Sequence, residues 1–462
     1  MCPWRLAWLP PLRSEDLLDK IIVEGGVPLS GSIRVQGSKN SALPILFATI
    51  LTEDPCTIRN VPDLSDVDTT MSILRELGMS CEREETGCLR IETDNPDSHT
   101  AGYELVSTMR ASICTLGPLL ARRGKAKVSL PGGCVFGAGG DEAGRPIDLH
   151  LMGLEALGAR IKLRNGYIEA DAPRLKGNTI DLSGPNGSTV TGTANILMAA
   201  TLAEGTTVIK NAAFEPEVTD LALFLNKMGA CIEGIESSTL TIEGVQGLRG
   251  VDYEVMADRI EAGTYLIAGA VTRGNISVEG VQPAQLESLT DSLDQAGVLL
   301  NIGKNRVEVS TNGSIRPVNV ATLPYPGFPT DLQAPLTVLL TQADGTSQII
   351  ENVYKDRFMH VPELNRLGAN IRQSDNHVTL TGTNGLSGAD VMASDLRAGA
   401  SLVLAGLAAK GRTVIHRVYH IDRGYERLEE KLASLGAKIW RDDEGEGPDV
   451  EDEAIHIPVG LA

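Results

Sequence analysis

The stretch AGASLVLAGLAAKGRTVI, residues 398–415, decides the fold. Residues 398–409 are almost all apolar or good helix formers, and Gly411 ends the run. The β-branched residues 413–415 that follow are typical of a strand. The stretch therefore predicts a buried helix that leads directly into a strand.

A second helix is expected just downstream. Apolar residues recur there at helical spacing, with Glu and Lys between them: Tyr425, Leu428, Leu432 and Leu435. Gly436 stands where a helix C-cap belongs, and residues 437–440 again have strand character. One unit therefore alternates strands with a buried and an amphipathic helix.

Two sequence patterns of this unit recur along the chain with the same spacing. The phrase Leu-Gly-Ala-x-Ile, or a close variant, has its glycine at Gly78, Gly158, Gly229, Gly297, Gly368 and Gly436. The apolar run with its strand recurs at residues 112–130, 195–210, 263–278, 334–350 and 399–415. Six α/β units of about 70 residues are too long for a solenoid. We expect three units around each of two helix bundles, a crossing near residues 255–259, and a ligand cleft between two domains.

The composition excludes several classes of protein. The chain has 462 residues, a net charge of -19 and only 4% aromatic residues. Surplus negative charge argues against nucleic acid and anionic membranes as partners, and no apolar run approaches the ~20 residues of a membrane helix. Regular strand alternation begins only at Asp19, and acids crowd the last twenty residues. We therefore expect a disordered extension at 1–18 and an acidic disordered tail at 441–462.

The cysteines and histidines point to a reduced compartment and no metal. Seven cysteines are an odd number without Cys-x-x-Cys spacing, which is typical of a cytoplasmic protein. Seven histidines are scattered without metal-ligand spacing. No protein-held metal and no cofactor is expected.

Three segments carry chemistry. Lys39 opens an apolar helix in GSKNSALP, where a cation beside free helix N–H groups suits a phosphate or carboxylate. Cys134 lies in a glycine-rich stretch, 131–146, that is typical of a long loop. Charged residues precede several apolar runs: Arg110, Asp331, Arg357, Asp395, Arg397 and Arg423. Each alone could be a solvated cap, but together they indicate a cleft for a multiply anionic small molecule.

At these residues the chain resembles the enolpyruvyl transferases. The resemblance runs from Asp19 to Trp440 and rests on GSKNSALPILFA, TMRAS, LPGGC, GRPIDLH, ATLAEGTT, FPTDLQA, DRFMHVPEL, SDLRAGASLVLAG and YHIDRGYERLE. It implies a two-domain inside-out α/β barrel of six βαβαββ repeats, three per domain. Residues 19–38 plus 257–440 would form domain I, and 39–256 domain II with the catalytic loop 131–146.

The resemblance also implies a reaction, the first committed step of peptidoglycan synthesis. The 3-hydroxyl of UDP-N-acetylglucosamine would attack phosphoenolpyruvate, and phosphate would leave. Asp331 is then the expected base and Cys134 the expected acid, the latter alkylated by fosfomycin. Lys39 and Arg397 are also expected to be catalytic, and Arg357 and Asp395 to support them. Phosphoenolpyruvate would be bound by Lys39, Asn40, Arg145, Arg397 and Arg423. UDP-N-acetylglucosamine would be bound by Asn40, Arg110, Arg145, Pro146, Leu149, Thr189, Val190, Thr191, Asp331 and Val353.

Three features depart from the family pattern. The segment from Cys134 to Arg145 is longer than usual and adds Asp141 and Glu142 where an anion must bind. Residues 187–191 read GSTVT where many members have a lysine and a Ser-Val-Gly run at the diphosphate. The tail after Trp440 has no counterpart.

These departures keep other functions open. One alternative is transfer to another acceptor such as shikimate 3-phosphate, against which the Cys134 loop and HIDRGYE argue. Another is a non-catalytic paralogue that binds sugar nucleotides, against which the joint presence of Cys134, Asp331, Lys39 and Arg397 argues. An RNA 3'-phosphate cyclase, built of related repeats, is disfavoured by the acidity and by the enolpyruvyl motifs.

Overall fold

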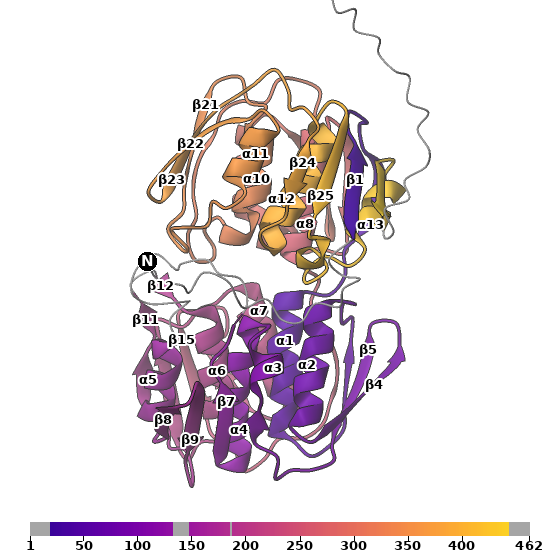
Figure 1. The fold of residues 1–462 in the computed structure, drawn as a ribbon. Helices are drawn as coiled ribbons and strands as arrows, with labels where there is room; N and C mark the ends of the chain where they lie inside the picture. The colour runs from indigo at the N-terminus through magenta and orange to yellow at the C-terminus, as the bar shows by residue number, and fades with distance from the viewer. Residues whose placement is uncertain (1–18, 133–146, 185–186, 443–462) are drawn as a thin grey trace, which may run out of the picture.

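The computed structural model describes residues 19–132, 147–184 and 187–442. Helices and strands alternate throughout in an α/β fold (Figure 1). Residues 398–415 lie in α12 (Leu396–Ala408) and β25 (Arg412–His416), so the predicted buried helix and its strand are confirmed. All but two residues of α12 are buried, because its apolar residues surround the whole helix rather than one face.

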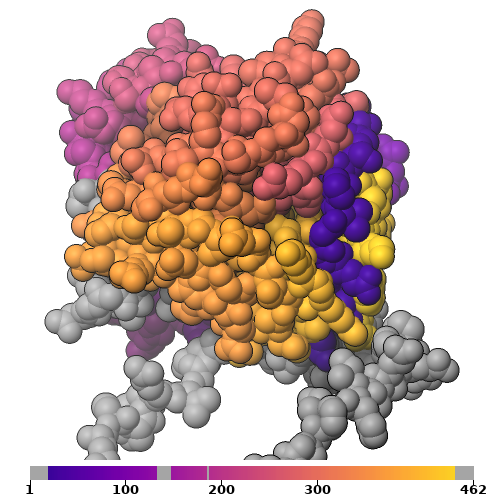
Figure 2. All heavy atoms as spheres, turned by 90° about the horizontal axis from the view of Figure 1, so that it is seen from above, coloured from indigo at the N-terminus to yellow at the C-terminus, as the bar shows by residue number. Residues whose placement is uncertain are grey.

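Buried apolar residues form two separate hydrophobic cores. The terminal core contains buried residues from 21–35 and 260–439, and the middle core those from 42–255. Figure 1 shows the elements of the terminal core above those of the middle core. Strand β1 (Lys20–Glu24) joins the terminal core because it pairs with β25 on one side and β26 (Lys438–Asp442) on the other. Figure 2 shows this N-terminal segment in indigo beside the yellow C-terminal part of the chain.

Each core carries three open sheets of four strands within the described residues. In every sheet the first two strands are parallel and the remaining neighbours antiparallel. In the terminal core the orders are β24 (Asp390–Met392)-β25-β1-β26, β2 (Ser30–Arg34)-β17 (Asn275–Glu279)-β19 (Arg306–Ser310)-β18 (Leu299–Ile302), and β20 (Asn319–Ala321)-β21 (Thr346–Ile350)-β23 (His377–Thr381)-β22 (Asn370–Ser374).

The middle core repeats the pattern. Its orders are β16 (Asp252–Glu254)-β3 (Cys56–Arg59)-β5 (Cys88–Thr93)-β4 (Met79–Glu85), β6 (Thr100–Ala101)-β7 (Lys125–Ser129)-β9 (Tyr167–Asp171)-β8 (Arg160–Arg164), and β10 (Thr179–Asp181)-β13 (Thr206–Lys210)-β15 (Thr239–Glu243)-β14 (Cys231–Glu233). A short hairpin, β11 (Ser183–Gly184) with β12 (Gly187–Ser188), stands apart. None of the described sheets closes on itself.

The helices divide into buried and covering ones. The apolar helices are α1 (Lys39–Ala48), α4 (Leu116–Arg123) and α6 (Val190–Ala200) in the middle core, and α8 (Arg259–Val271), α10 (Gln333–Leu340) and α12 in the terminal core. The other helices are α2 (Ser65–Glu76), α3 (Tyr103–Val106), α5 (Asp148–Ala156), α7 (Pro216–Met228), α9 (Glu287–Gln295), α11 (Val361–Arg366) and α13 (Leu428–Ser434). Short 3-10 turns lie at Thr49–Leu51, Arg110–Thr115, Pro283–Leu286, Thr330–Leu332 and Val418–His420.

Two chain segments cross between the cores, side by side. Ser38 N–H donates to the Met256 carbonyl over 2.7 Å, and Asp258 N–H donates to the Gln36 carbonyl over 2.8 Å. Gly37 permits this close approach, because a Cβ there would lie 1.6 Å from the Asn60 carbonyl oxygen. Each crossing leads straight into a buried helix, α1 at Lys39 and α8 at Arg259. The starts of these helices therefore face the junction of the cores.

Candidate functional site

Asp331 lies between two arginines just before α10. Its Oδ1 is 2.7 Å from Arg357 Nη1, and its Oδ2 is 3.0 Å from Arg397 Nη2. Burial alone would raise the pKa of this carboxyl, but the two guanidiniums outweigh burial and hold the pKa well below its usual range. The Asp331 side chain remains 25% exposed. It is therefore an ionised carboxylate at neutral pH that a ligand can reach.

A fully buried acid, Glu351, fixes the turn that carries Asp331. Its Oε2 accepts from Thr330 Oγ1 over 2.9 Å, and its Oε1 accepts from the backbone N–H groups of Val353 and Tyr354, also over 2.9 Å. Arg357 Nη1 donates to the same Thr330 hydroxyl over 3.1 Å. Glu351 thus ties the Asp331 turn to the segment that contains Val353 and Arg357.

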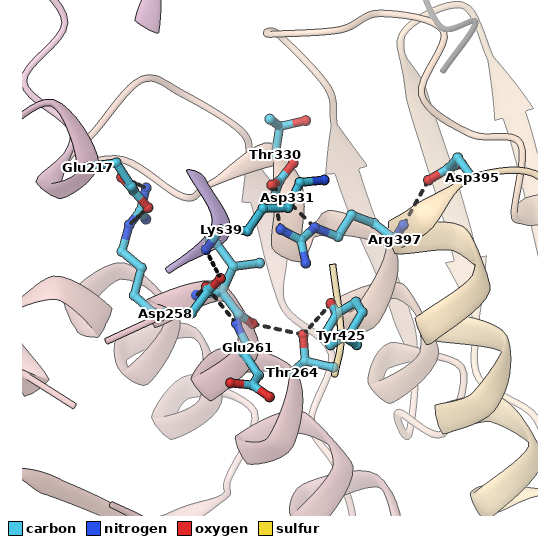
Figure 3. A network of polar contacts seen from close by, with 12 residues as sticks. Lys39, Glu217, Asp258, Glu261, Thr264, Thr330, Asp331, Asp395, Arg397 and Tyr425 are labelled. Atoms are coloured by element: carbon cyan, nitrogen blue, oxygen red, sulfur yellow. Dashed lines mark hydrogen bonds and ion pairs between the residues drawn. The ribbon is translucent and has the colours of Figure 1, made fainter. Parts of the chain in front are cut away.

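Arg397 is a buried cation with a spare donor. It is 1% exposed and is the second residue of α12, which Asp395 caps, and its guanidinium lies 5.1 Å from the centre of the Tyr425 ring (Figure 3). Burial lowers the pKa of the guanidinium, yet Tyr425 and Asp331 raise it above the ordinary value overall. Among the described residues, Arg397 Nη1 is buried without a hydrogen-bond partner. A buried unpaired N–H is costly, so this geometry favours an anionic ligand at Nη1.

A second charged cluster joins the two cores. Lys39 Nζ of α1 lies 2.6 Å from Asp66 Oδ2 in the first turn of α2, and Arg423 Nε lies 2.9 Å from Asp66 Oδ1. Burial lowers the pKa of Lys39, helped by the nearby charges of Arg423 and Arg397 and opposed by Asp66. The influence of Arg397 on Lys39 shows that this cluster adjoins the Asp331 cluster. Together they put several cations and the partly exposed Asp331 carboxylate at the junction of the cores.

Replacing Asp66 by Asn is expected to destabilise the protein. Lys39 and Arg423 would lose their shared counter-ion in a buried setting, and breaking a buried pair costs about 3–5 kcal/mol. Urea unfolding measures the loss. The matched control is Asp252→Asn, which breaks the exposed pair with Arg59 and should cost less than about 1 kcal/mol. Equal stabilities of the two variants would contradict this reading of the cluster.

A third group surrounds His150 in α5 of the middle core. Its Nε2 lies 3.2 Å from Thr191 Oγ1 and its Nδ1 lies 3.1 Å from Asn195 Nδ2, both of α6. Burial, with help from the charge of Arg110, lowers the pKa of His150 to about 3. Thr189 caps α6 by accepting from Gly192 N–H. Arg110 begins the 3-10 turn Arg110–Thr115, which packs against α6, and the N–H groups and hydroxyls at the start of that helix favour an anion.

The buried neutral His150 predicts a pH-dependent stability. Its folded pKa is lower than the unfolded value near 6.5, so the unfolded chain gains a proton first as pH falls. Stability is therefore complete above about pH 7 and decreases from there toward pH 3. Between pH 7 and 5, wild type should lose about 2 kcal/mol more than His150→Gln in urea unfolding. His99→Gln, at a partly exposed site, should behave as wild type. Equal losses in wild type and His150→Gln would contradict the prediction.

The structure brings together part of the predicted site. Asp331, Arg357 and Arg397 are in contact, and Lys39 shares Asp66 with Arg423. The helix predicted to begin at Lys39 is confirmed. Asn40 is exposed beside Lys39, and Val190 is exposed at the start of α6. Leu149 lies on α5 against Gly184 of the β11–β12 hairpin. Cys134, Arg145 and Pro146 lie outside the described residues.

Sequence reasoning missed the anionic partners that organise these cations. Asp66 and Glu351 were not singled out, nor was Tyr425 as the ring beneath Arg397. Asp66 follows a serine at a helix start, where an acid is ordinary, so no local signal distinguishes it.

Other expected features concern metals and membranes. No group of three or more His, Cys, Asp or Glu in the described part of the chain could hold a metal ion. Within residues 19–132, 147–184 and 187–442, no helix has the length and apolar character needed to cross a bilayer. Cys56, Cys81, Cys88, Cys114 and Cys231 are free thiols.

Solved structures give the class to which this fold belongs. The enolpyruvyl transferase NikO from Streptomyces tendae superposes with a TM-score of 0.82 at 28% identity, covering 92% of this chain and 98% of NikO. An EPSP synthase from Acinetobacter baumannii has a TM-score of 0.69 at 18% identity, covering 92% and 100%, which is a likeness of fold. Residues 23–432 match the family EPSP synthase (3-phosphoshikimate 1-carboxyvinyltransferase). The fold and sequence are thus those of enolpyruvyl transferases.

Relatives with similar sequences show which family of enolpyruvyl transferases the chain belongs to. Proteins named UDP-N-acetylglucosamine 1-carboxyvinyltransferase are 52% identical over 424 residues in Methylacidiphilum infernorum and 50% identical over 427 residues in Myxococcus xanthus. Each match covers 92% of this chain and at least 99% of the relative. Within the enolpyruvyl transferases, this chain belongs to the UDP-N-acetylglucosamine 1-carboxyvinyltransferase family.

Proposed function

We propose that this protein transfers the enolpyruvyl group of phosphoenolpyruvate to the 3-hydroxyl of UDP-N-acetylglucosamine and releases phosphate. The observation that carries the proposal is the partly exposed Asp331 carboxylate beside Arg397, Arg357 and Lys39, in a chain about half identical to transferases of that name. The reaction is the first committed step of peptidoglycan synthesis, in the cytoplasm. It makes the enzyme a contributor to cell shape and division.

The cations hold the donor. Phosphoenolpyruvate carries a phosphate and a carboxylate, and Lys39, Arg397 and Arg423 supply charge for both, with Asn40 beside them. The spare Nη1 of Arg397 supports this role. Fixed cations at these positions stabilise charge that develops on the substrate without reorganising at the moment of reaction. Arg145, in the segment after Cys134, completes this set.

Asp331 takes the proton of the attacking hydroxyl. Its low pKa keeps the carboxylate ionised and ready, although it makes Asp331 a weak base. Proton removal therefore accompanies bond formation to the donor rather than preceding it. Arg357 and Asp395 support the step, the first by pairing with Asp331 and the second by capping the helix that carries Arg397.

The acid that protonates the methylene carbon as the hydroxyl adds is Cys134. When phosphate then leaves the tetrahedral intermediate, one proton is lost from the new methyl group, which restores the double bond of the enolpyruvyl ether. This thiol of Cys134 is also the group that fosfomycin would alkylate.

The acceptor lies along the middle core. The start of α6, with Thr189, Val190 and Thr191, binds the diphosphate through hydroxyl and backbone N–H groups, and Arg110 adds a charge. Leu149 with Arg145 and Pro146 lies at the uridine, and Val353 at the sugar. The backbone of Val353 is held by Glu351, which supports a fixed sugar position.

The architecture that fits this reaction is two domains of inside-out α/β barrel type. Residues 19–38 with 257–440 form domain I, residues 39–256 form domain II, and each contains three βαβαββ repeats. The shared strand pattern of the sheets and the two separate cores support this division. No metal, cofactor or nucleic acid takes part.

Phosphate release from phosphoenolpyruvate tests the proposal. UDP-N-acetylglucosamine and shikimate 3-phosphate are compared as acceptors, each with and without fosfomycin, and Cys134→Ala is run alongside. Release with the sugar nucleotide alone, lost on fosfomycin treatment and in Cys134→Ala, is expected. Release with shikimate 3-phosphate alone would reassign the acceptor. Binding of UDP-N-acetylglucosamine without any release would mean a sugar-nucleotide-binding protein instead.

A further inference from the structure

A buried arginine outside the proposed active site connects the two cores. Arg259 is the first residue of α8, directly after the second crossing. Its Nε lies 3.0 Å from Glu217 Oε1 and its Nη2 lies 3.2 Å from Glu217 Oε2. Glu217, labelled in Figure 3, belongs to α7 of the middle core. The side chains are only 9% and 4% exposed. Two parallel bonds of this kind fix orientation as well as distance.

The same guanidinium contacts the loop that leads to Asp331. It lies 5.6 Å from the centre of the Tyr325 ring. Two backbone hydrogen bonds close residues 323–328 into a compact loop. Leu323 N–H donates to the Phe328 carbonyl, and Gly327 N–H donates to the Pro324 carbonyl. Tyr325 is six residues before Asp331, so the position of the ring influences where the Asp331 turn begins.

The middle core also contacts Tyr325 through two residues before α7. Phe214 meets the Tyr325 ring edge to face, with centroids 5.9 Å apart. Glu215 Oε1 accepts from the Tyr325 N–H over 3.4 Å, which is a long bond. Phe214 and Glu215 immediately precede α7, the helix that carries Glu217. The 323–328 loop of the terminal core therefore contacts both Arg259 and the middle-core residues Phe214 and Glu215.

The neighbouring residue links this contact to Lys39. Asp258 accepts from the N–H groups of Ile260 and Glu261 with Oδ1, and from the Lys39 N–H over 3.2 Å with Oδ2. Residues 258 and 259 therefore fix the start of α1, the start of α8 and the Tyr325 loop at one place. These elements carry the cation Lys39 and lead to the carboxylate Asp331.

Stability alone does not explain a buried ion pair at this junction. Removing two charges from water is expensive, and apolar residues of similar volume often stabilise a protein as well or better. Burial also raises the pKa of Glu215, and its Oε2 has no hydrogen-bond partner among the described residues. What the pair does supply is one defined arrangement of the two cores.

We propose that Arg259 is a positioning residue: with Glu217 and Tyr325 it holds the 323–328 loop against the middle core and so sets Asp331 opposite Lys39. Arg259 acts through this loop and touches neither substrate. The kinetic consequence rests on the proposed function, whereas the placement of the loop does not.

Kinetics of matched variants test the catalytic consequence. Arg259→Gln should lower kcat by about tenfold to a hundredfold, because small misplacements of reacting groups are costly, while KM for each substrate changes less than threefold. Arg259→Lys should restore part of kcat. Tyr325→Phe keeps the ring and should match wild type, whereas Tyr325→Leu should lose kcat as Arg259→Gln does. Arg59→Gln, at the exposed pair with Asp252, is the control that leaves kcat unchanged.

Hydrogen exchange tests the loop without any turnover. The N–H groups of Leu323, Tyr325, Gly327 and Phe328 should exchange at least threefold faster in Arg259→Gln and Tyr325→Leu than in wild type, Tyr325→Phe or Arg59→Gln. If wild type shows no turnover but the variants differ from it in exchange as expected, the proposed function is wrong and the positioning role stands. Wild-type exchange and kcat in both Arg259→Gln and Tyr325→Leu would overturn the positioning role. If Arg259→Gln does not fold, kcat and hydrogen exchange of Glu217→Gln, Tyr325→Phe and Tyr325→Leu test the positioning role instead.

Discussion

Asp331→Asn is expected to lower kcat for enolpyruvyl transfer by about 10³-fold, since a positioned general base contributes about 10²–10⁴-fold. The amide cannot take the hydroxyl proton, and it also leaves Arg357 and Arg397 without their shared counter-ion. The change should fall on kcat, because the cations that bind phosphoenolpyruvate remain. Phosphate release at saturating substrates measures it.

The control for Asp331 keeps the charge. Asp331→Glu retains a carboxylate but moves it by one methylene, so it should keep more activity than Asp331→Asn. Thermal unfolding of both variants separates lost chemistry from lost folding. A kcat of Asp331→Asn within tenfold of wild type, in a folded protein, would remove Asp331 from the proton transfer.

Arg397→Gln is expected to have the second large effect, a fall in kcat/KM of about 10²–10³-fold, the range found on removing one preorganised donor from a developing charge. Arg397 pairs with Asp331, and its buried Nη1 has no hydrogen-bond partner among the described residues. The free energy of unfolding should also decrease by about 3 kcal/mol, because a buried partner of Asp331 is lost. Steady-state kinetics and urea unfolding measure the two effects.

Two comparisons sharpen the Arg397 prediction. Arg397→Lys keeps the positive charge but loses the planar set of guanidinium N–H donors. Relative to Arg397→Gln, it should therefore recover more of the free energy of unfolding than of kcat/KM. Arg160→Gln breaks an exposed arginine–aspartate pair and should change neither. A kcat/KM of Arg397→Gln within threefold of wild type would show that Nη1 does not bind the donor.

The local elements were predictable because their signals are local. The apolar run at 398–409 and the β-branched residues 413–415 became α12 and β25 with small shifts at the ends. The helix start at Lys39 was predicted by its place before an apolar run. Charge at the starts of buried helices was also visible, and the fold brings Asp331, Arg357 and Arg397 into contact.

The partners of these charges were not predictable, since they come from distant segments. Arg423 meets Asp66 across 357 positions, and Arg259 meets Glu217 across 42. Glu217 lies in the first turn of α7, which is an ordinary place for an acid. Only the packing of one core on the other identifies such residues as organisers of the site.

The most direct test of the central account is the structure of the product. Phosphoenolpyruvate labelled with ¹³C at its central carbon is incubated with UDP-N-acetylglucosamine and the protein, and the mixture is followed by NMR. We expect an enolpyruvyl ether on the 3-oxygen of the sugar, formed in equal amount to phosphate. Unchanged phosphoenolpyruvate after prolonged incubation with folded protein, or an ether at another oxygen, would contradict it.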